Sequence, residues 1–157
     1  MLKKAKERLS IQDQSKRIEF REIDLNRVEG ITKKFDLILG VDIIHHIDDP
    51  KKVFIGLKKL LSENGKLVFL ETNIYNPLTW LNIIGNEHEI RAVLNTPKNF
   101  SNWLNEAGFL KIKISSTPTF TPSGPKPLGN LLGFIDKLVI KIPKLRKICA
   151  LWLIEAH

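Results

Sequence analysis

Two apolar segments separated by a well-marked helix constrain the fold of this 157-residue chain more than any other feature. FDLILGV (35–41) is almost wholly apolar, and KLVFLET (66–72) is a second run of the same kind. Between them, Asp49-Pro50 can begin a helix whose apolar residues recur with helical spacing until Asn64-Gly65, where glycine favours a helix end. Apolar strands joined by a helix are typical of parallel sheets covered on both faces. The sequence therefore predicts a βαβ unit.

Further elements are expected on both sides of this unit, within a single domain of 157 residues. They are a helix at 2–11, a half-buried strand at 17–25, an irregular lid or helical insertion at 73–95, a helix from Thr96-Pro97 to Gly108, an edge strand at 109–115, a helical stretch at 129–142 and a strand at 148–156. Strands alternating with helices predict an α/β fold with a mostly parallel sheet. The last strand follows an excursion at 117–147, so it can insert beside its predecessor in the antiparallel sense.

Charge and cysteine content exclude several classes of protein. The formal net charge is +8, but no Arg/Gly/aromatic pattern accompanies the basic residues, so we expect solvated faces and no specific nucleic-acid partner. The single cysteine, Cys149, excludes an internal disulfide framework and fits a cytoplasmic location.

Lysines interleave with apolar residues at 128–145. This stretch favours an ordinary packed helix, with peripheral contact to an anionic membrane as the alternative.

His45 and His46 are the most conspicuous candidates for chemistry, because imidazole can bind metal or move protons. Adjacent residues in a turn point in different directions. No cysteine or carboxylate cluster stands beside them at ligand spacing. The sequence therefore predicts no metal site.

The segment 35–73 resembles the second half of class I S-adenosylmethionine-dependent methyltransferases, of the group that acts on small molecules. The residues that carry the resemblance are Phe35-Asp36 at a strand start, His45-His46 in the following turn, Asp49-Pro50 at a helix start, and Leu60-Leu61 with Gly65 at the helix exit. A second block, at 89–109, matches the family's pattern of Thr-Pro, helix and Ala-Gly-Phe.

The resemblance implies a Rossmann-like methyltransferase fold with helices on both faces and an antiparallel last strand, but an incomplete one. The family's glycine-rich cofactor turn has no counterpart before Arg17. We therefore expect a chain truncated at its N-terminal side, with a gap in the sheet between the strands at 17–23 and 35–41.

S-adenosylmethionine is the cofactor that the resemblance implies. Its predicted contacts are Asp24, Leu25, Gly40 and Val41. Asp24 matches the acidic position that accepts a hydrogen bond from the adenine amino group, and capping of the next turn is the alternative. Gly40 lies where strand ends meet ligands in parallel sheets, and a simple strand-end glycine is equally compatible.

The predicted catalytic residues are His46 and His88. His46 matches a family histidine that lines the pocket, with general-base action as the lesser interpretation, and His88 is the favoured proton acceptor if one is needed. Tyr75, Glu87 and Arg91 are expected to contact the acceptor, in a polar group that also holds Glu71 and Asn73; an ordinary polar loop is the alternative. The apolar residues of the same segment are Trp80, Leu81, Ile83 and Ile84, and they favour an apolar acceptor.

The predicted function is therefore methyl transfer from S-adenosylmethionine to a small, apolar or lipid-like acceptor. Two alternatives stay open: an inactive truncated or split enzyme, and a non-enzymatic binding or membrane-surface module. A homodimer or a complementing N-terminal fragment would close the expected gap in the sheet.

Overall fold

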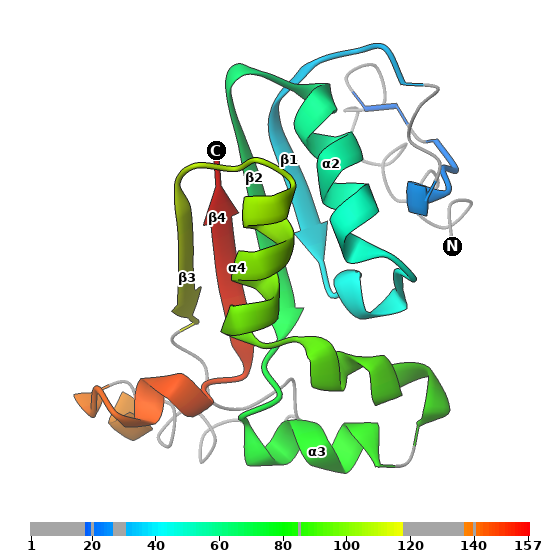
Figure 1. Cartoon of the computed structure of the whole chain (residues 1–157). Helices are drawn as coiled ribbons and strands as arrows, with labels where there is room; N and C mark the ends of the chain where they lie inside the picture. The colour runs from blue at the N-terminus through cyan, green and yellow to red at the C-terminus, as the bar shows by residue number, and fades with distance from the viewer. Residues whose placement is uncertain (1–17, 20, 27–30, 85, 118–136, 140) are drawn as a thin grey trace.

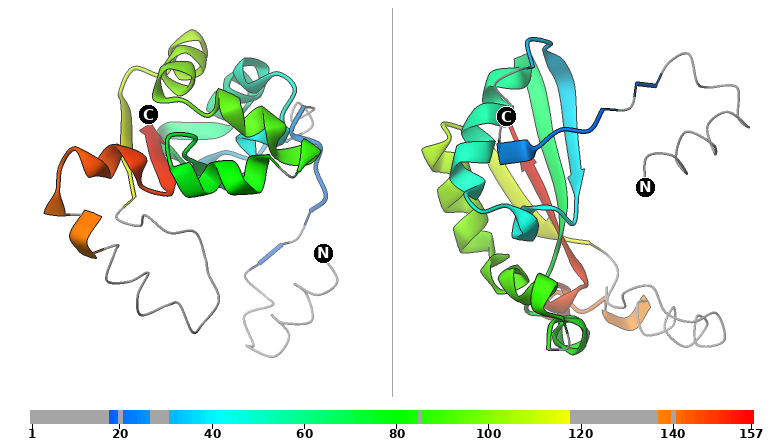
Figure 2. Two further views of the ribbon diagram at one scale, coloured as in Figure 1. Left: turned by 90° about the horizontal axis from the view of Figure 1, so that it is seen from below. Right: turned by 90° about the vertical axis from the view of Figure 1, so that its right-hand side faces the viewer.

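The computed structural model of the chain describes residues 18–19, 21–26, 31–84, 86–117, 137–139 and 141–157. These residues form a four-stranded mixed sheet with the strand order β1-β2-β4-β3. Helices α2 and α4 lie side by side on one face of the sheet (Figures 1 and 2). The predicted helix at 2–11 lies outside the described residues. No described helix is both long and apolar enough to cross a membrane.

The predicted βαβ unit is confirmed. Strand β1 (Phe35–Val41) pairs in parallel with β2 (Leu61–Thr72), and α2 (Pro50–Leu60) connects them. Asp49 caps the helix, because its Oδ1 accepts a hydrogen bond of 3.0 Å from the Lys52 backbone N–H. The buried face of α2 presents Val53, Phe54, Leu57 and Leu60.

The exit of this helix was predicted wrongly. The helix ends at Leu60 and β2 begins at the next residue, so Asn64-Gly65 lies inside the strand and not at a helix terminus. Gly65 is needed there for another reason: a Cβ would lie 2.8 Å from the Phe35 carbonyl oxygen of the neighbouring strand. The glycine thus permits a close approach of two backbones where the β1–β2 register shifts.

The last strand takes the predicted antiparallel position. β4 (Leu151–Ala156) lies between β2 and β3 (Ile112–Ser116) and is antiparallel to both. Three strands therefore run in one direction and β4 opposes them. β3 is an edge strand, as predicted.

The second capped helix is also confirmed. α4 (Pro97–Glu106) begins where Thr96 Oγ1 accepts a hydrogen bond of 3.1 Å from the Asn99 N–H. It ends at Glu106, and Gly108, two residues later, has a φ of 86° in the left-handed region that glycine adopts readily. Its inward side chains Phe100 and Leu104 are fully buried against the core.

The predicted strand at 17–25 is wrong. Its described residues 18–19 and 21–24 are not in a strand, and both Ile18 and Ile23 are 42% exposed. The alternating pattern is present, but a strand forms only where its N–H and C=O groups find a neighbouring strand. Within the described residues, β1 has a strand neighbour on one side only.

β1 is accordingly less covered than its composition predicts. Leu37, Leu39 and Val41, on the face away from α2, are 49%, 66% and 66% exposed. The prediction that this strand is covered on both faces is therefore wrong for the described part of the chain.

The segment 73–95 contains α3 (Pro77–Ile83) and the 3-10 segment η3 (Glu87–Leu94). Both lie at the carboxyl ends of β1 and β2 (Figure 1). The short 3-10 segments η2 (Ile44–His46) and η5 (Leu145–Ile148) follow β1 and precede β4. Of the helix predicted at 129–142, residues 137–139, 141 and 142 are described, and all of these except Ile142 are helical.

Candidate functional site

The turn that leaves β1 lies at the carboxyl ends of the two parallel strands, where open α/β sheets bind their ligands. Asp42 occupies this turn with a φ of 51°, which non-glycine residues adopt uncommonly. Two contacts to β2 hold it there. Its N–H donates to the Leu70 carbonyl at 2.7 Å, and its Oδ1 accepts a hydrogen bond of 2.6 Å from the Thr72 hydroxyl.

Glu71 of β2 is fully buried beneath this turn. Its Oε1 accepts hydrogen bonds of 3.0 Å from the backbone N–H groups of Ile43 and Ile44, the two residues after Asp42. Its Oε2 accepts a longer one, 3.3 Å, from the Asn95 side-chain amide. A buried carboxylate requires such donors, because desolvation of an unpaired charge is costly. Glu71 therefore ties β2, η2 and the residue after η3 together.

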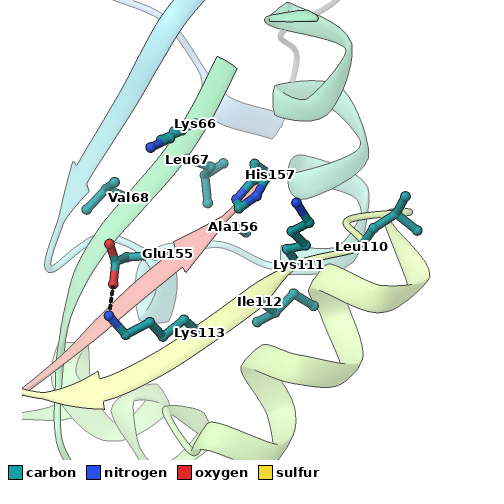
Figure 3. A pocket seen from close by; sticks show the side chains of 10 residues that line it. All are labelled: Lys66, Leu67, Val68, Leu110, Lys111, Ile112, Lys113, Glu155, Ala156 and His157. Carbon is teal, nitrogen blue, oxygen red and sulfur yellow. Dashed lines mark ion pairs between the residues drawn. The ribbon is translucent and has the colours of Figure 1, made fainter. Parts of the chain in front are cut away.

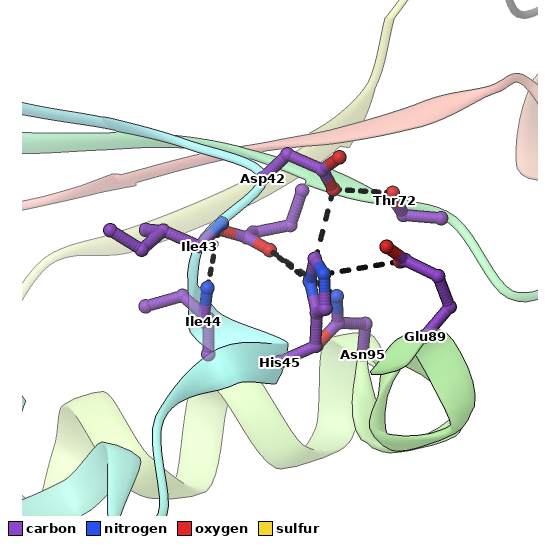
Figure 4. A network of polar contacts seen from close by, with 8 residues as sticks. Asp42, Ile43, Ile44, His45, Thr72, Glu89 and Asn95 are labelled. Carbon is purple, nitrogen blue, oxygen red and sulfur yellow. Dashed lines mark hydrogen bonds and ion pairs between the residues drawn. The ribbon is translucent and has the colours of Figure 1, made fainter. Parts of the chain in front are cut away.

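His45 lies beside Glu71 and its side chain is completely buried. Three carboxylates surround the ring: Asp42 Oδ1 at 3.8 Å and Glu71 Oε2 at 3.6 Å from Nδ1, and Glu89 Oε2 at 3.2 Å from Nε2 (Figure 4). Neither ring nitrogen has a hydrogen bond of good geometry with the described residues. The Glu71 carboxylate is the main cause that raises the pKa of His45, with Asp42 and Glu89 acting in the same direction and burial opposing them.

The predicted catalytic histidine, His46, lies beside this group, with a ring nitrogen within 4.8 Å of ligand atoms of His45 and Glu89. Its side chain is exposed, and its ring centroid lies 3.9 Å from that of His45. The two histidines thus differ in burial, although their rings are in contact. The other predicted catalytic residue, His88, and the predicted acceptor contact Glu87 lie in η3, but their side chains are outside the described part of the structure.

The other predicted acceptor contacts already have partners in the fold. Arg91 donates from Nη1 to Asp48 Oδ1 at 2.6 Å, which links η3 to the residues before α2. Tyr75 is 50% exposed and packs edge-on against Trp152, with ring centroids 5.9 Å apart. Both residues lie near the carboxyl ends of β1 and β2, and His46 and Asp42 lie at this same end of the sheet.

The four predicted cofactor contacts do not come together. Asp24 Oδ1 accepts hydrogen bonds from the backbone N–H and the side-chain amide of Asn26, at 2.9 and 3.0 Å. These bonds match the alternative interpretation of Asp24, capping of the next turn. Leu25 packs against the core and lines a pocket of about 560 Å³ together with Ile55 and Lys52 of α2.

Gly40 and Val41 lie elsewhere, at the end of β1. A Cβ on Gly40 would be 2.1 Å from the Phe69 ring, so the packing of β2 accounts for the glycine without a ligand. Val41 is exposed and leaves its side chain open to a ligand. The described residues therefore supply at most one wall of a site for S-adenosylmethionine and do not complete it.

A further pocket, of about 330 Å³, lies near the amino end of β3, remote from Asp42 (Figure 3). Its charged lining includes Lys66, Lys111 and the ion pair of Lys113 with Glu155, 3.3 Å apart. None of the predicted site residues lies in it.

Sequence reasoning named His45 and Glu71 among its candidates, but it missed Asp42, Glu89 and Asn95 and did not predict that the five lie together. These residues come from three separate segments, the turn after β1, the end of β2 and η3 with the residue after it, and no linear spacing joins them. One signal was present: Asp42 and Glu71 each stand at the end of an apolar strand. Parallel pairing places such ends side by side.

Comparison with known proteins adds to this geometry. Residues 1–67 match the sequence model of a family described as "Methyltransferase domain". The ubiquinone biosynthesis O-methyltransferase of Glaesserella parasuis is 28% identical over 80 residues, which are 51% of this chain and 34% of that protein. The tRNA U34 carboxymethyltransferase of Campylobacter jejuni is 27% identical over 104 residues, 64% of this chain and 35% of that protein. The chain thus spans about a third of the length of these relatives.

A solved SAM-dependent methyltransferase from Archaeoglobus fulgidus shares the fold, with a TM-score of 0.59 at 13% identity over 93% of this chain and 70% of that one. Sequence match and fold therefore agree. The resemblance to class I S-adenosylmethionine-dependent methyltransferases is therefore supported by a family match over residues 1–67, by curated relatives that are methyltransferases and by the shared fold.

Proposed function

We propose that this protein takes part in methyl transfer from S-adenosylmethionine to a small, apolar acceptor. The observation that carries the proposal is the position of α3 and η3 across the carboxyl ends of β1 and β2, with apolar side chains open to solvent. Trp80, Ile84 and Ile90 are 41%, 78% and 61% exposed. An apolar surface beside the ligand-binding end of a parallel sheet suits an acceptor that is itself apolar.

The residues at this end hold and orient ligands; none of the described contacts indicates proton transfer. The cofactor, when bound, supplies an activated methyl group, so the chief requirement is alignment with the acceptor atom, and proximity supplies much of the rate. The Glu71 carboxylate fixes the turn that carries Val41 and Asp42. The Arg91–Asp48 pair fixes η3 beside that turn.

The rest of the cofactor site is part of the proposal. Val41 can contact the cofactor from one side only, so other residues must enclose the rest of the cofactor. In our proposal they lie outside the described residues, in this chain, in a complementing fragment or in a second copy.

Calorimetric titration with S-adenosylhomocysteine, the product form of the cofactor, tests the proposal. We expect saturable binding by the wild-type chain. Val41→Arg should abolish it, because a long cation would occupy the wall at the end of β1. Leu110→Arg is the matched control, since Leu110 is 90% exposed and lies between α4 and β3 at the other end of the sheet.

The absence of binding heat from a chain shown by circular dichroism to be folded would reject the proposal for this chain acting alone. It would favour the alternative of a non-enzymatic module that keeps the family's fold. Equal binding by the wild-type chain and Val41→Arg would place the cofactor elsewhere and would also contradict the proposal.

The choice of acceptor has its own test. With the remaining parts of the site present, Trp80→Ala should raise KM for an apolar phenolic acceptor more than it lowers kcat, because it removes contact area and not a reacting group. An unchanged KM would exclude α3 from acceptor binding.

A further inference from the structure

The buried histidine at the end of β1 has an unusual environment. The His45 side chain has no exposed area, yet neither of its nitrogens makes a well-aligned hydrogen bond with the described residues. Buried polar atoms are nearly always paired, and each exception calls for an explanation. Three carboxylates face this one ring, so the group carries an excess of negative charge that a single protonated histidine does not balance.

The spacing of the atoms around Nδ1 suits a bound cation. Asp42 Oδ1 and Glu71 Oε2 lie 3.8 and 3.6 Å from Nδ1, and all three atoms lie within 4.8 Å of one another. Zinc binds imidazole nitrogen and carboxylate oxygen at about 2.0–2.2 Å, so two tetrahedral ligands of one zinc ion are about 3.4 Å apart. The three atoms therefore lie somewhat farther apart than the ligands of one bound ion, and the site would contract when an ion binds.

Both carboxylates are already oriented by other groups, as metal ligands commonly are. The Thr72 hydroxyl holds Asp42 at 2.6 Å, and the amides of Ile43 and Ile44 hold the far oxygen of Glu71. The other nitrogen of His45 faces Glu89 Oε2 at 3.2 Å, and a carboxylate commonly accepts the free N–H of a ligating histidine. Nδ1, Oδ1 and Oε2 thus lie close together, with Oε2 also accepting the longer hydrogen bond from Asn95.

We propose that Asp42, His45 and Glu71 form a binding site for a divalent transition-metal ion of the Zn²⁺ type. Three protein ligands leave a fourth position for water or another oxygen ligand. That position faces the Asp42 side, where the side chain is 51% exposed, while Glu71 and His45 are closed off from solvent. Imidazole favours Zn²⁺ over Mg²⁺, which prefers an all-oxygen shell.

This site departs from the sequence prediction of no metal site. That prediction looked for ligands near His45-His46 along the chain, whereas Glu71 reaches His45 only because β1 and β2 are parallel neighbours. A second grouping, of His45, His46 and Glu89, also falls within ligand range. We favour the first grouping, because its two carboxylates are held by hydrogen bonds and the His46 side chain is exposed.

Metal titration of the chelator-treated chain, without cofactor, tests the proposal. We expect one Zn²⁺ per chain by competition with a chromogenic chelator, no competition by millimolar Mg²⁺, and tetrahedral d–d absorption when Co²⁺ replaces Zn²⁺. Asp42→Asn should weaken Zn²⁺ binding by at least about tenfold. Asparagine tolerates the positive φ at this position, so the variant should keep the fold.

His46→Gln is the matched control, because it changes the neighbouring imidazole and leaves all three proposed ligands intact. Binding should be unchanged in this variant. Loss of binding in His46→Gln but not in Asp42→Asn would overturn the proposal in favour of the second grouping. Wild-type affinity in Asp42→Asn, with circular dichroism unchanged, would also overturn it. Because no cofactor is present, either result is independent of the proposed methyl transfer.

Discussion

β1 and β2 are similar in sequence, and their surroundings differ. In β2, which is paired on both sides, Val68 and Leu70 are half-buried, and they are the partners of Leu39 and Val41 on the same face of the sheet. In β1, which is paired on one side among the described residues, Leu39 and Val41 are both 66% exposed. Apolar composition therefore predicts that a segment becomes a strand, and the neighbours that the rest of the fold provides decide how far the strand is covered. If the neighbours decide the coverage, substitutions in the covered and the open parts of the sheet should differ in their effect on the free energy of unfolding.

The largest expected effect belongs to the interior of the sheet. Ile154 of β4 is fully buried against the core, so Ile154→Ala should lower the free energy of unfolding by about 2–5 kcal/mol. Chemical denaturation monitored by circular dichroism measures it. Leu39→Ala is the control on β1 and should cost far less. Equal losses would mean that the exposed face of β1 is covered in solution, and the contrast would fail.

The second effect concerns charge at the end of β2. Glu71→Gln keeps the shape but weakens the hydrogen bonds that the carboxylate accepts from Ile43 and Ile44, so we expect a loss of about 2–3 kcal/mol in the metal-free protein. Glu155→Gln on β4 is the control, because that carboxylate is partly exposed in its pair with Lys113. A loss no larger than that of Glu155→Gln would show that the turn after β1 does not depend on the buried charge.

A third substitution examines the contact between the two strands. Gly40→Ala places a methyl group in the volume of the Phe69 ring, and overpacking of this kind costs about 1–3 kcal/mol. If packing is the cause, Phe69→Leu should recover part of the loss in the double variant. Additive losses would contradict this explanation and would reopen a ligand-binding role for Gly40.

The smallest effect is expected on the open face of β1. Leu39→Thr should change the free energy of unfolding by no more than about 0.5 kcal/mol, because surface substitutions rarely do more. Thermal denaturation together with sedimentation velocity measures both stability and association. A large loss that depends on protein concentration would indicate that a second copy covers this face.

The sequence predicted the elements whose signals are local. Asp49 and Thr96 cap helices, Gly108 closely follows the end of one, and the two apolar runs are parallel neighbours. The strand at 17–25 failed because alternation describes one chain segment, whereas a strand needs a partner. Gly65 was misassigned for a similar reason, since its neighbour Phe35 is distant in sequence.

The candidate site was predictable only in its location. The carboxyl ends of β1 and β2 were expected to hold the functional residues, and Val41, His46 and Arg91 do lie there. The pairing of His45 with Glu71 and Glu89 was not predictable, because it depends on strand register and on the placement of η3. The roles proposed for these side chains stay predictions.

The insertion of β4 between β2 and β3 has a consequence for folding kinetics. Thr72 of β2 pairs with Leu151 of β4, so the chain between them, residues 73–150, must form a closed loop before these two central strands can pair. Contacts between such distant segments slow folding, because the loop entropy is lost before the ladder forms. Until β4 arrives, the edges of β2 and β3 that it will occupy expose unpaired backbone groups, and these favour aggregation. We therefore expect slow refolding whose yield falls as protein concentration rises.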